Sequence, residues 1–211
     1  MHVVHVITRL IIGGAQQNTL LTCEDQHRDY SDEVTLITGP PIGPEGSLME
    51  RATAAGFRVI ELDSMRRSIH PWRDWRSYRE LLAVLRDLRP DIVHTHSSKA
   101  GIIGRCAASK LNIPAVHTIH GSAFHFGQPA AAFRLYRSLE RHAARWCDRF
   151  ISVCDSLTDQ YVSAGVAAPD RFTTVYSGMD VEPFLNPPRS REDVRADLGL
   201  TDNQVAVVKI A

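Results

Sequence analysis

The chain has 211 residues, 44% of them hydrophobic, which is enough for one α/β domain with a substantial core. Its 24 basic and 24 acidic side chains give a formal net charge of zero, and this balance argues against a dedicated nucleic-acid-binding protein. Four cysteines without metal-ligand spacing, and apolar runs shorter than the roughly 18–20 residues of a membrane-spanning helix, predict a cytoplasmic protein without disulfides.

Short apolar runs alternate with longer helical patterns, beginning with a strand-like run where a signal peptide would stand. The apolar runs predict strands at residues 2–7, 33–38, 58–62, 91–95, 114–119, 149–153 and 172–176. The segments between them predict helices at residues 15–28, 47–55, 72–89, 99–111, 130–147 and 155–164. This alternation predicts an α/β, Rossmann-like, three-layer domain over residues 1–185, with helices on both faces of a parallel sheet.

The loop after the first predicted strand is the first candidate for ligand binding. In a doubly wound sheet, ligands bind at the carboxyl ends of the strands. The loop contains Arg9, Gln16 and the pair Gly13-Gly14, which stands directly before a predicted helix. Two glycines there let a phosphate approach the backbone N–H groups, and they suit a tight strand-to-helix turn equally well.

The loop after the fourth predicted strand begins with two histidines. His94 and His96 share one face of the strand because they are two residues apart. Such a pair suits a metal ion, but no further histidine or acidic cluster follows at ligand spacing, so we expect no metal. Ser98 and Lys99, at the start of the next helix, fit a substrate cleft better.

Three later loops carry single polar candidates. His120-Gly121 leaves an imidazole above the sheet, where it binds a sugar hydroxyl or serves the structure. Asp155 is expected, with Ser156 as the alternative, to cap the next helix. The segment 177–180 forms a turn at the exit from the sheet.

The end of the sequence has a different character. A proline-containing connector follows residue 185, a helix pattern covers residues 190–198, and residues 205–211 predict a further buried strand. That strand has no partner in the first domain. We therefore expect residues 186–211 to form a linker and the first strand of a truncated second domain.

Taken together and in this order, the loops resemble the N-terminal domain of family 4 glycosyltransferases, which have the two-domain GT-B fold. The segments that carry the resemblance are 9–16 (RLIIGGAQ), 90–96 (PDIVHTH), 117–121 (HTIHG), 151–156 (ISVCDS) and 176–180 (YSGMD). The last of these departs from the common Asn-Gly-Val-Asp and keeps only its glycine and aspartate.

The resemblance implies transfer of a sugar from a nucleotide-diphosphate sugar to a glycosyl acceptor, with retention and without a required metal or other cofactor. It implies a role in cell-envelope, polysaccharide or glycolipid biosynthesis. It places His120 at the transferred sugar as the catalytic residue, and Gly13 and Gly14 at the donor diphosphate. The remaining candidates line the acceptor and substrate cleft: Arg9, Gln16, His96, Ser98, Lys99, Gly121, Asp155, Ser177 and Asp180.

The family's donor-binding arginine and lysine and its paired glutamates belong to a C-terminal domain that this sequence lacks. We therefore expect the 211-residue chain to be inactive without that partner domain. One alternative is half of a sugar-nucleotide 2-epimerase, with Asp155 and His120 placed for proton transfer.

A second alternative is a non-catalytic binding module. The predicted helix 130–147 carries a stripe of arginines opposite its apolar side, at positions Arg134, Arg137, Arg141 and Arg145. Such a stripe suits anionic lipid headgroups, so we expect a peripheral contact with the inner face of a membrane.

Overall fold

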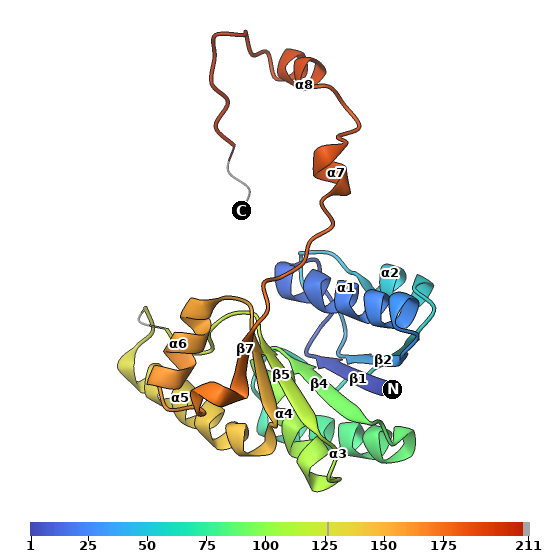
Figure 1. Cartoon of the computed structure of the whole chain (residues 1–211), viewed down its shortest axis with the longest axis vertical. Coiled ribbons are helices and arrows are strands. Elements are labelled where there is room, and N and C mark those ends of the chain that lie inside the picture. The colour runs from blue at the N-terminus through green and yellow to red at the C-terminus, as the bar shows by residue number, and fades with distance from the viewer. Residues whose placement is uncertain (126, 209–211) are drawn as a thin grey trace. The chain divides into compact units, whose positions relative to one another are not determined.

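The computed structural model describes residues 1–125 and 127–208, and its backbone divides into one unit at residues 1–178 and a second at residues 179–211. In the described part of the first unit, seven parallel strands form one sheet in the order β3-β2-β1-β4-β5-β6-β7 (Figure 1). The strands are β1 (His2–Ile7), β2 (Glu33–Thr38), β3 (Arg58–Glu61), β4 (Ile92–His96), β5 (Ala115–Ile119), β6 (Arg149–Ser152) and β7 (Phe172–Thr174). The predicted parallel sheet is confirmed.

Among the described residues, six α-helices connect these strands, and all six were predicted. They are α1 (Gly14–Asp29), α2 (Met49–Ala54), α3 (Pro71–Leu88), α4 (Ser98–Lys110), α5 (Ala130–Ala143) and α6 (Asp155–Ser163). The predicted helix 130–147 ends earlier, and a 3-10 turn at Ala144–Trp146 continues it. No described helix is long and apolar enough to cross a membrane.

The core lies in two layers, one on each face of the sheet. Alternate residues of a strand point to opposite faces. Ile7 therefore packs with Leu20 and Cys23 of α1, whereas Val4 and Val6 pack with the helices α3 and α4. A third cluster, around Phe150, joins α5 and α6 to the second layer. All four cysteines are free thiols, as predicted.

The second unit contains two short helices, α7 (Glu182–Leu185) and α8 (Arg191–Asp197). Ser190 caps α8 by accepting a hydrogen bond of 3.0 Å from the backbone N–H of Asp193, so the predicted helix is present. Residues 205–208 form no strand, and Val205 is 88% exposed. The rest of the predicted strand, residues 209–211, lies outside the described residues. A second domain beginning there stays a prediction.

Candidate functional site

A cavity of about 810 Å³ lies at the carboxyl ends of β1 and β4. These two strands are neighbours in the sheet, but α1 leaves β1 toward one face and α4 leaves β4 toward the other. The loops therefore diverge at this point, which is where open α/β sheets bind ligands. The predicted residues that line the cavity are Arg9, Gly13, Gln16, Ser98 and Lys99.

Thr8 and Ser97 hold the two walls of the cavity together. Ser97 precedes α4 with a φ of 61°, a left-handed conformation that is rare outside glycine. Thr8, at the end of β1, bonds the Ser97 hydroxyl at 2.7 Å and accepts a 3.3 Å hydrogen bond from the backbone N–H of Ala100. The residue that directly follows β1 thus caps α4, a connection that no local sequence pattern could have predicted.

The segment at residues 9–17, which we call the glycine loop, leaves the amino end of α1 accessible. Gly13 precedes α1, and its carbonyl accepts a 2.8 Å hydrogen bond from the N–H of Gln17. Among the described residues, no side chain caps this end of the 16-residue helix. A Cβ on Gly14 would meet nothing within 4 Å. The positive end of a helix dipole with uncapped N–H groups suits an anion such as a phosphate.

Arg9 forms hydrogen bonds with the segment that precedes α2. Its Nη1 donates to the carbonyl of Ile42 at 2.8 Å, and its Nη2 lies 3.3 Å from Glu45 Oε1. The guanidinium therefore fastens the glycine loop to the segment before α2, while its edge lines the cavity.

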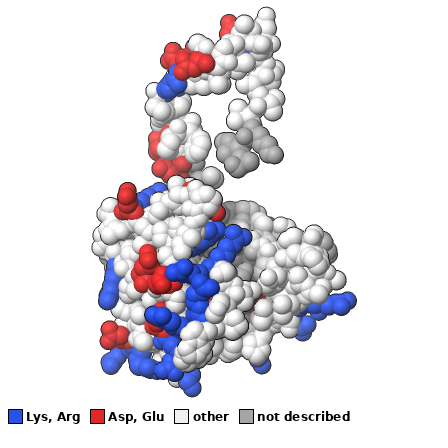
Figure 2. Space-filling model, turned by 180° about the vertical axis from the view of Figure 1, so that it is seen from behind, with Lys and Arg blue, Asp and Glu red and all other residues white. Residues whose placement is uncertain are grey.

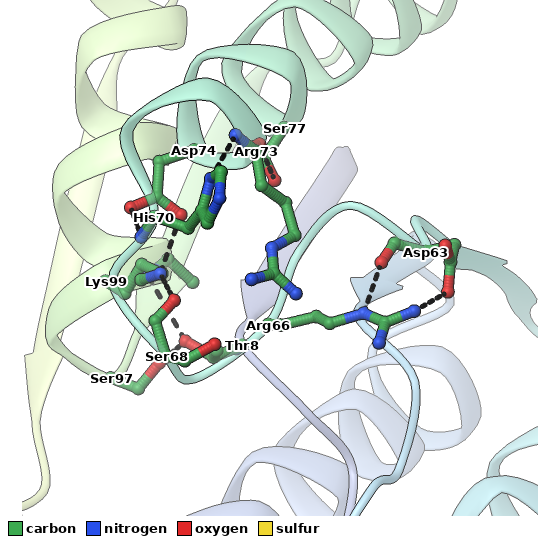
Figure 3. A network of polar contacts seen from close by, with 11 residues as sticks. Thr8, Asp63, Arg66, Ser68, His70, Arg73, Asp74, Ser77, Ser97 and Lys99 are labelled. Atoms are coloured by element: carbon green, nitrogen blue, oxygen red, sulfur yellow. Dashed lines mark hydrogen bonds and ion pairs between the residues drawn. The ribbon is translucent and has the colours of Figure 1, made fainter.

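Lys99 is likewise tied to its surroundings. Its Nζ donates to Asp74 Oδ1 at 2.7 Å and to the carbonyl of Ser68, so it fixes the segment that leads into α3 (Figure 3). Asp74 also accepts a 3.1 Å hydrogen bond from the N–H of His70. Figure 3 also shows Arg66 of this segment turned toward Asp63, whose Oδ1 accepts a 2.6 Å hydrogen bond from Arg66 Nη2, whereas Arg67 lines the cavity.

Glu140, which lines the cavity, belongs to a buried ion pair that sequence reasoning missed. Arg105 Nη2 of α4 donates to Glu140 Oε2 of α5 at 3.0 Å, and both side chains are almost wholly buried. Arg105 Nε donates to the carbonyl of Gly101 at 2.8 Å. Removing one partner of such a pair typically costs about 3–5 kcal/mol, because a charge stays buried alone. The pair joins two elements 35 residues apart, so no spacing rule could reveal it.

His96 and His120 belong to a chain of hydrogen-bonded side chains. Gln26 of α1 bonds His5 of β1 at 2.7 Å, His5 bonds His96 at 3.0 Å, and His96 bonds His120 at 3.0 Å. His5 faces His94 in the strand register, and both point toward α1. We call these four side chains the histidine chain: Gln26, His5, His96 and His120.

The buried histidines are neutral near pH 7. Burial lowers the pKa of His5 and of His120 to about 4, and lowers the pKa of His94 and His96 well below 6.5. A ring nitrogen of each of His5, His94 and His96 lies within 4.8 Å of the others, a grouping that can hold a metal ion. However, His5 and His96 already bond each other, and His94 Nε2 bonds Thr118 Oγ1 at 2.7 Å. The expectation of no metal stays a prediction.

The other predicted residues lie outside the cavity lining. Gly121 is exposed, and a Cβ there would meet nothing within 4 Å. Neither Asp155 nor Ser156 caps α6 as predicted: Cys154 precedes the helix, and no side chain among the described residues caps it. Asp155 instead accepts a 2.9 Å hydrogen bond from the hydroxyl of Tyr176. Hydrogen bonds from Thr174 and Tyr176 lower the pKa of Asp155. Ser177 is exposed, and Asp180 belongs to the second unit.

Comparison with known proteins places this geometry in context. The model of the glycosyl transferase 4-like domain matches residues 13–178. The UDP-Gal:alpha-D-GlcNAc-diphosphoundecaprenol alpha-1,3-galactosyltransferase of Escherichia coli is 30% identical over 203 residues, which are 95% of this chain and 51% of that protein. The chain therefore spans about half the length of this relative.

Two solved structures share the fold at low sequence identity. Anabaena Alr3699/HepE in complex with UDP and glucose superposes with a TM-score of 0.67 at 16% identity, over 94% of this chain and 50% of that one. The UDP-GlcNAc 2-epimerase from Methanocaldococcus jannaschii superposes with a TM-score of 0.60 at 14% identity, over 83% of this chain and 45% of that one. These likenesses establish the architecture.

The neutral histidines predict that stability falls in mild acid. Their folded-state pKa values lie below the unfolded value of about 6.5, so the unfolded state binds more protons as the pH drops. As the pH falls from about 6.5 toward its folded-state pKa, each such histidine lowers the free energy of unfolding by about 1.4 kcal/mol per pH unit. Urea unfolding at pH 7.5, 6.5 and 5.5 measures this loss. A free energy of unfolding that stays level over this range contradicts the assignment.

Proposed function

The chain belongs to the glycosyl transferase 4-like domain family, and we propose that it is the N-terminal, acceptor-side half of an enzyme that transfers a sugar from a nucleotide-diphosphate sugar to an acceptor. The observation that carries the proposal is the cavity between the glycine loop and the start of α4. One wall offers the uncapped positive end of α1 to a phosphate, and the other offers Ser98 and the basic segment before α3.

We propose a retaining reaction without a metal ion. The bond between the sugar's anomeric carbon and the diphosphate oxygen breaks, and the acceptor oxygen bonds that carbon on the same face. The leaving phosphate oxygen takes the proton of the acceptor hydroxyl, so no protein nucleophile is required. In this scheme the protein positions the reactants and stabilises the charge that develops on the diphosphate. The N–H groups at Gly13 and Gly14 supply part of that stabilisation, and His120 contacts the transferred sugar.

A 2-epimerase is the alternative enzyme on this architecture, and one neighbour in fold carries that name. Epimerisation moves a proton at the sugar's C2 and needs acid and base groups there. Hydrogen bonds from Thr174 and Tyr176 lower the pKa of Asp155, and burial lowers the pKa of His120 to about 4, so both groups are weak bases near neutral pH. These observations favour transfer.

We propose an amphiphilic, lipid-linked acceptor. Exposed apolar side chains ring the cavity at Ile12, Ile69 and Leu139, which are 49%, 70% and 40% exposed. Beside Ile69, the rings of Trp72 and Trp75 stack at 4.9 Å and are also exposed. Leu139 shares α5 with the exposed arginines Arg134 and Arg141, so this helix presents both apolar and basic side chains to solvent.

Exposed basic side chains suit an anionic membrane. Figure 2 shows Lys and Arg side chains gathered on one face of the residue 1–178 unit, with Asp and Glu side chains among them, although the net charge is zero. Arg134 and Arg141 of α5, and Arg145 of the 3-10 turn that continues it, are exposed. We propose that the protein works in the cytoplasm, in peripheral contact with the inner face of the membrane.

The reaction type is tested by incubating nucleotide-diphosphate sugars and a lipid-diphosphate acceptor with two proteins. One is the chain of 211 residues, and the other is the product of the complete native gene. We expect the complete protein to form an α-linked glycoside and the chain alone to form none, because half of the cleft is missing. Proton NMR of the products distinguishes a new glycoside from a C2-epimerised sugar nucleotide. Epimer without glycoside, or rapid transfer by the chain alone, contradicts the proposal.

The membrane contact is tested by co-sedimentation with vesicles. We expect binding to vesicles that contain anionic lipid and little binding to neutral ones. Trp72→Gln combined with Trp75→Gln should weaken binding several-fold, because apolar area no longer enters the interface. Tyr30→Gln is the matched control, since Tyr30 is 75% exposed at the end of α1, away from the cavity. Equal losses of binding in the tryptophan variant and in Tyr30→Gln, or equal binding to both vesicle types, would contradict the proposed membrane contact.

A further inference from the structure

The histidine chain runs from Gln26, in the last turn of α1, to His120 in the loop that follows β5. Its two inner rings, His5 and His96, are 0% and 1% exposed, and His120 is the partly exposed ring at its end. The bonds join Gln26 Oε1 to His5 Nε2, His5 Nδ1 to His96 Nε2, and His96 Nδ1 to His120 Nε2. Each inner imidazole therefore uses both of its nitrogens within the chain.

Neutral imidazoles can be linked in this way in only two arrangements. A neutral ring has one N–H group and one nitrogen with a lone pair. Each bond between two rings consumes one N–H and one lone pair, so every ring must donate in the same direction along the chain. The direction chosen at one end therefore fixes the tautomer of the ring at the other end.

Gln26 supplies the end that makes this choice. Its carbonyl oxygen faces His5, so it accepts the proton of His5 Nε2 at 2.7 Å. His5 Nδ1 must then accept from His96 Nε2–H, and His96 Nδ1 must accept from His120 Nε2–H. We propose that Gln26 is a positioning residue that, through His5 and His96, holds His120 in the tautomer with its proton on Nε2 and its lone pair on Nδ1.

This arrangement gives His120 a defined chemistry. Its Nδ1 has no partner among the described residues, and the neighbouring Gly121 leaves open space around its own Cα. A lone pair at that nitrogen accepts a hydrogen bond from a hydroxyl group and repels a phosphate oxygen. This step rests on the proposed function: the ring binds a hydroxyl of the sugar, and the diphosphate binds at the glycine loop. The chain ends in an amide that takes up no proton, so it fixes a hydrogen-bond direction and provides no proton exit.

His94 provides an internal comparison. The centroid of its ring lies 4.3 Å from that of His96 and the residue is also buried, but its Nε2 bonds Thr118 Oγ1 and not a member of the chain. A change at Thr118 therefore disturbs a buried histidine of the same cluster without cutting the histidine chain.

The test is a long-range 1H–15N correlation spectrum of the histidine rings, which distinguishes a protonated ring nitrogen from one with a lone pair. In the unmodified chain we expect His120 to carry its proton on Nε2 alone. In Gln26→Met the direction is no longer imposed, so the Nδ1–H form should appear. In the control Thr118→Val the tautomer of His120 should stay unchanged. A proton on His120 Nδ1 in the unmodified chain overturns the proposal, even if neither variant folds; so does a Gln26→Met spectrum identical to the unmodified one.

Ligand binding separates this proposal from the proposed function. In the complete protein, Gln26→Met should weaken binding of a nucleotide-diphosphate sugar about 5–10-fold, the scale of one hydrogen bond, while binding of the nucleotide diphosphate alone stays constant. If the tautomer changes but both ligands bind as before, the positioning by Gln26 stands and the placement of the sugar at His120 is wrong.

Discussion

β1 and β4 lie side by side in the sheet, and this adjacency determines where the site forms. The chain builds outward from β1 to β3 and then returns to the other side of β1, so two loops with opposite directions meet there. Thr8 and Ser97 lock this meeting point by bonding across the two strands, and Ser97 adopts a left-handed conformation to make it possible. The cavity, the glycine loop and the start of α4 all take their positions from that junction.

The same adjacency explains why so many polar groups are buried beside the cavity. The register sets His5 of β1 next to His94 of β4, and His96 continues the row toward the loops. Burying these rings is tolerable because they are neutral and hydrogen-bonded to one another or to Thr118. On the other face of the sheet, the buried charges of Arg105 and Glu140 are compensated because the two side chains form an ion pair. Both groups stiffen the walls of a site whose ligands are themselves polar.

The sequence was sufficient for the fold because the fold follows from local patterns. Continuous apolar runs and amphipathic segments are short-range signals, and they located each strand and each α-helix described in the first unit, but not the 3-10 turn at Pro169–Arg171. The site was only partly predictable, because its contacts join residues far apart in the sequence. The Gln26–His5 bond, the capping of α4 by Thr8 and the Arg105–Glu140 pair depend on which strands are neighbours, and spacing does not reveal that. The predicted cap at Asp155 failed because Tyr176, from beyond the next strand, bonds that carboxylate.

Hydrogen–deuterium exchange of the complete protein, with and without its nucleotide-diphosphate sugar, tests whether the ligand binds at the junction of β1 and β4. We expect the ligand to slow exchange in this chain at residues 9–17 and 120–122, the glycine loop and the loop of His120. The amino ends of the strands, at residues 30–32 and 111–114, should exchange as before. Protection confined to those amino-end loops, or absent from the glycine loop, would contradict the placement of the site at the junction of β1 and β4.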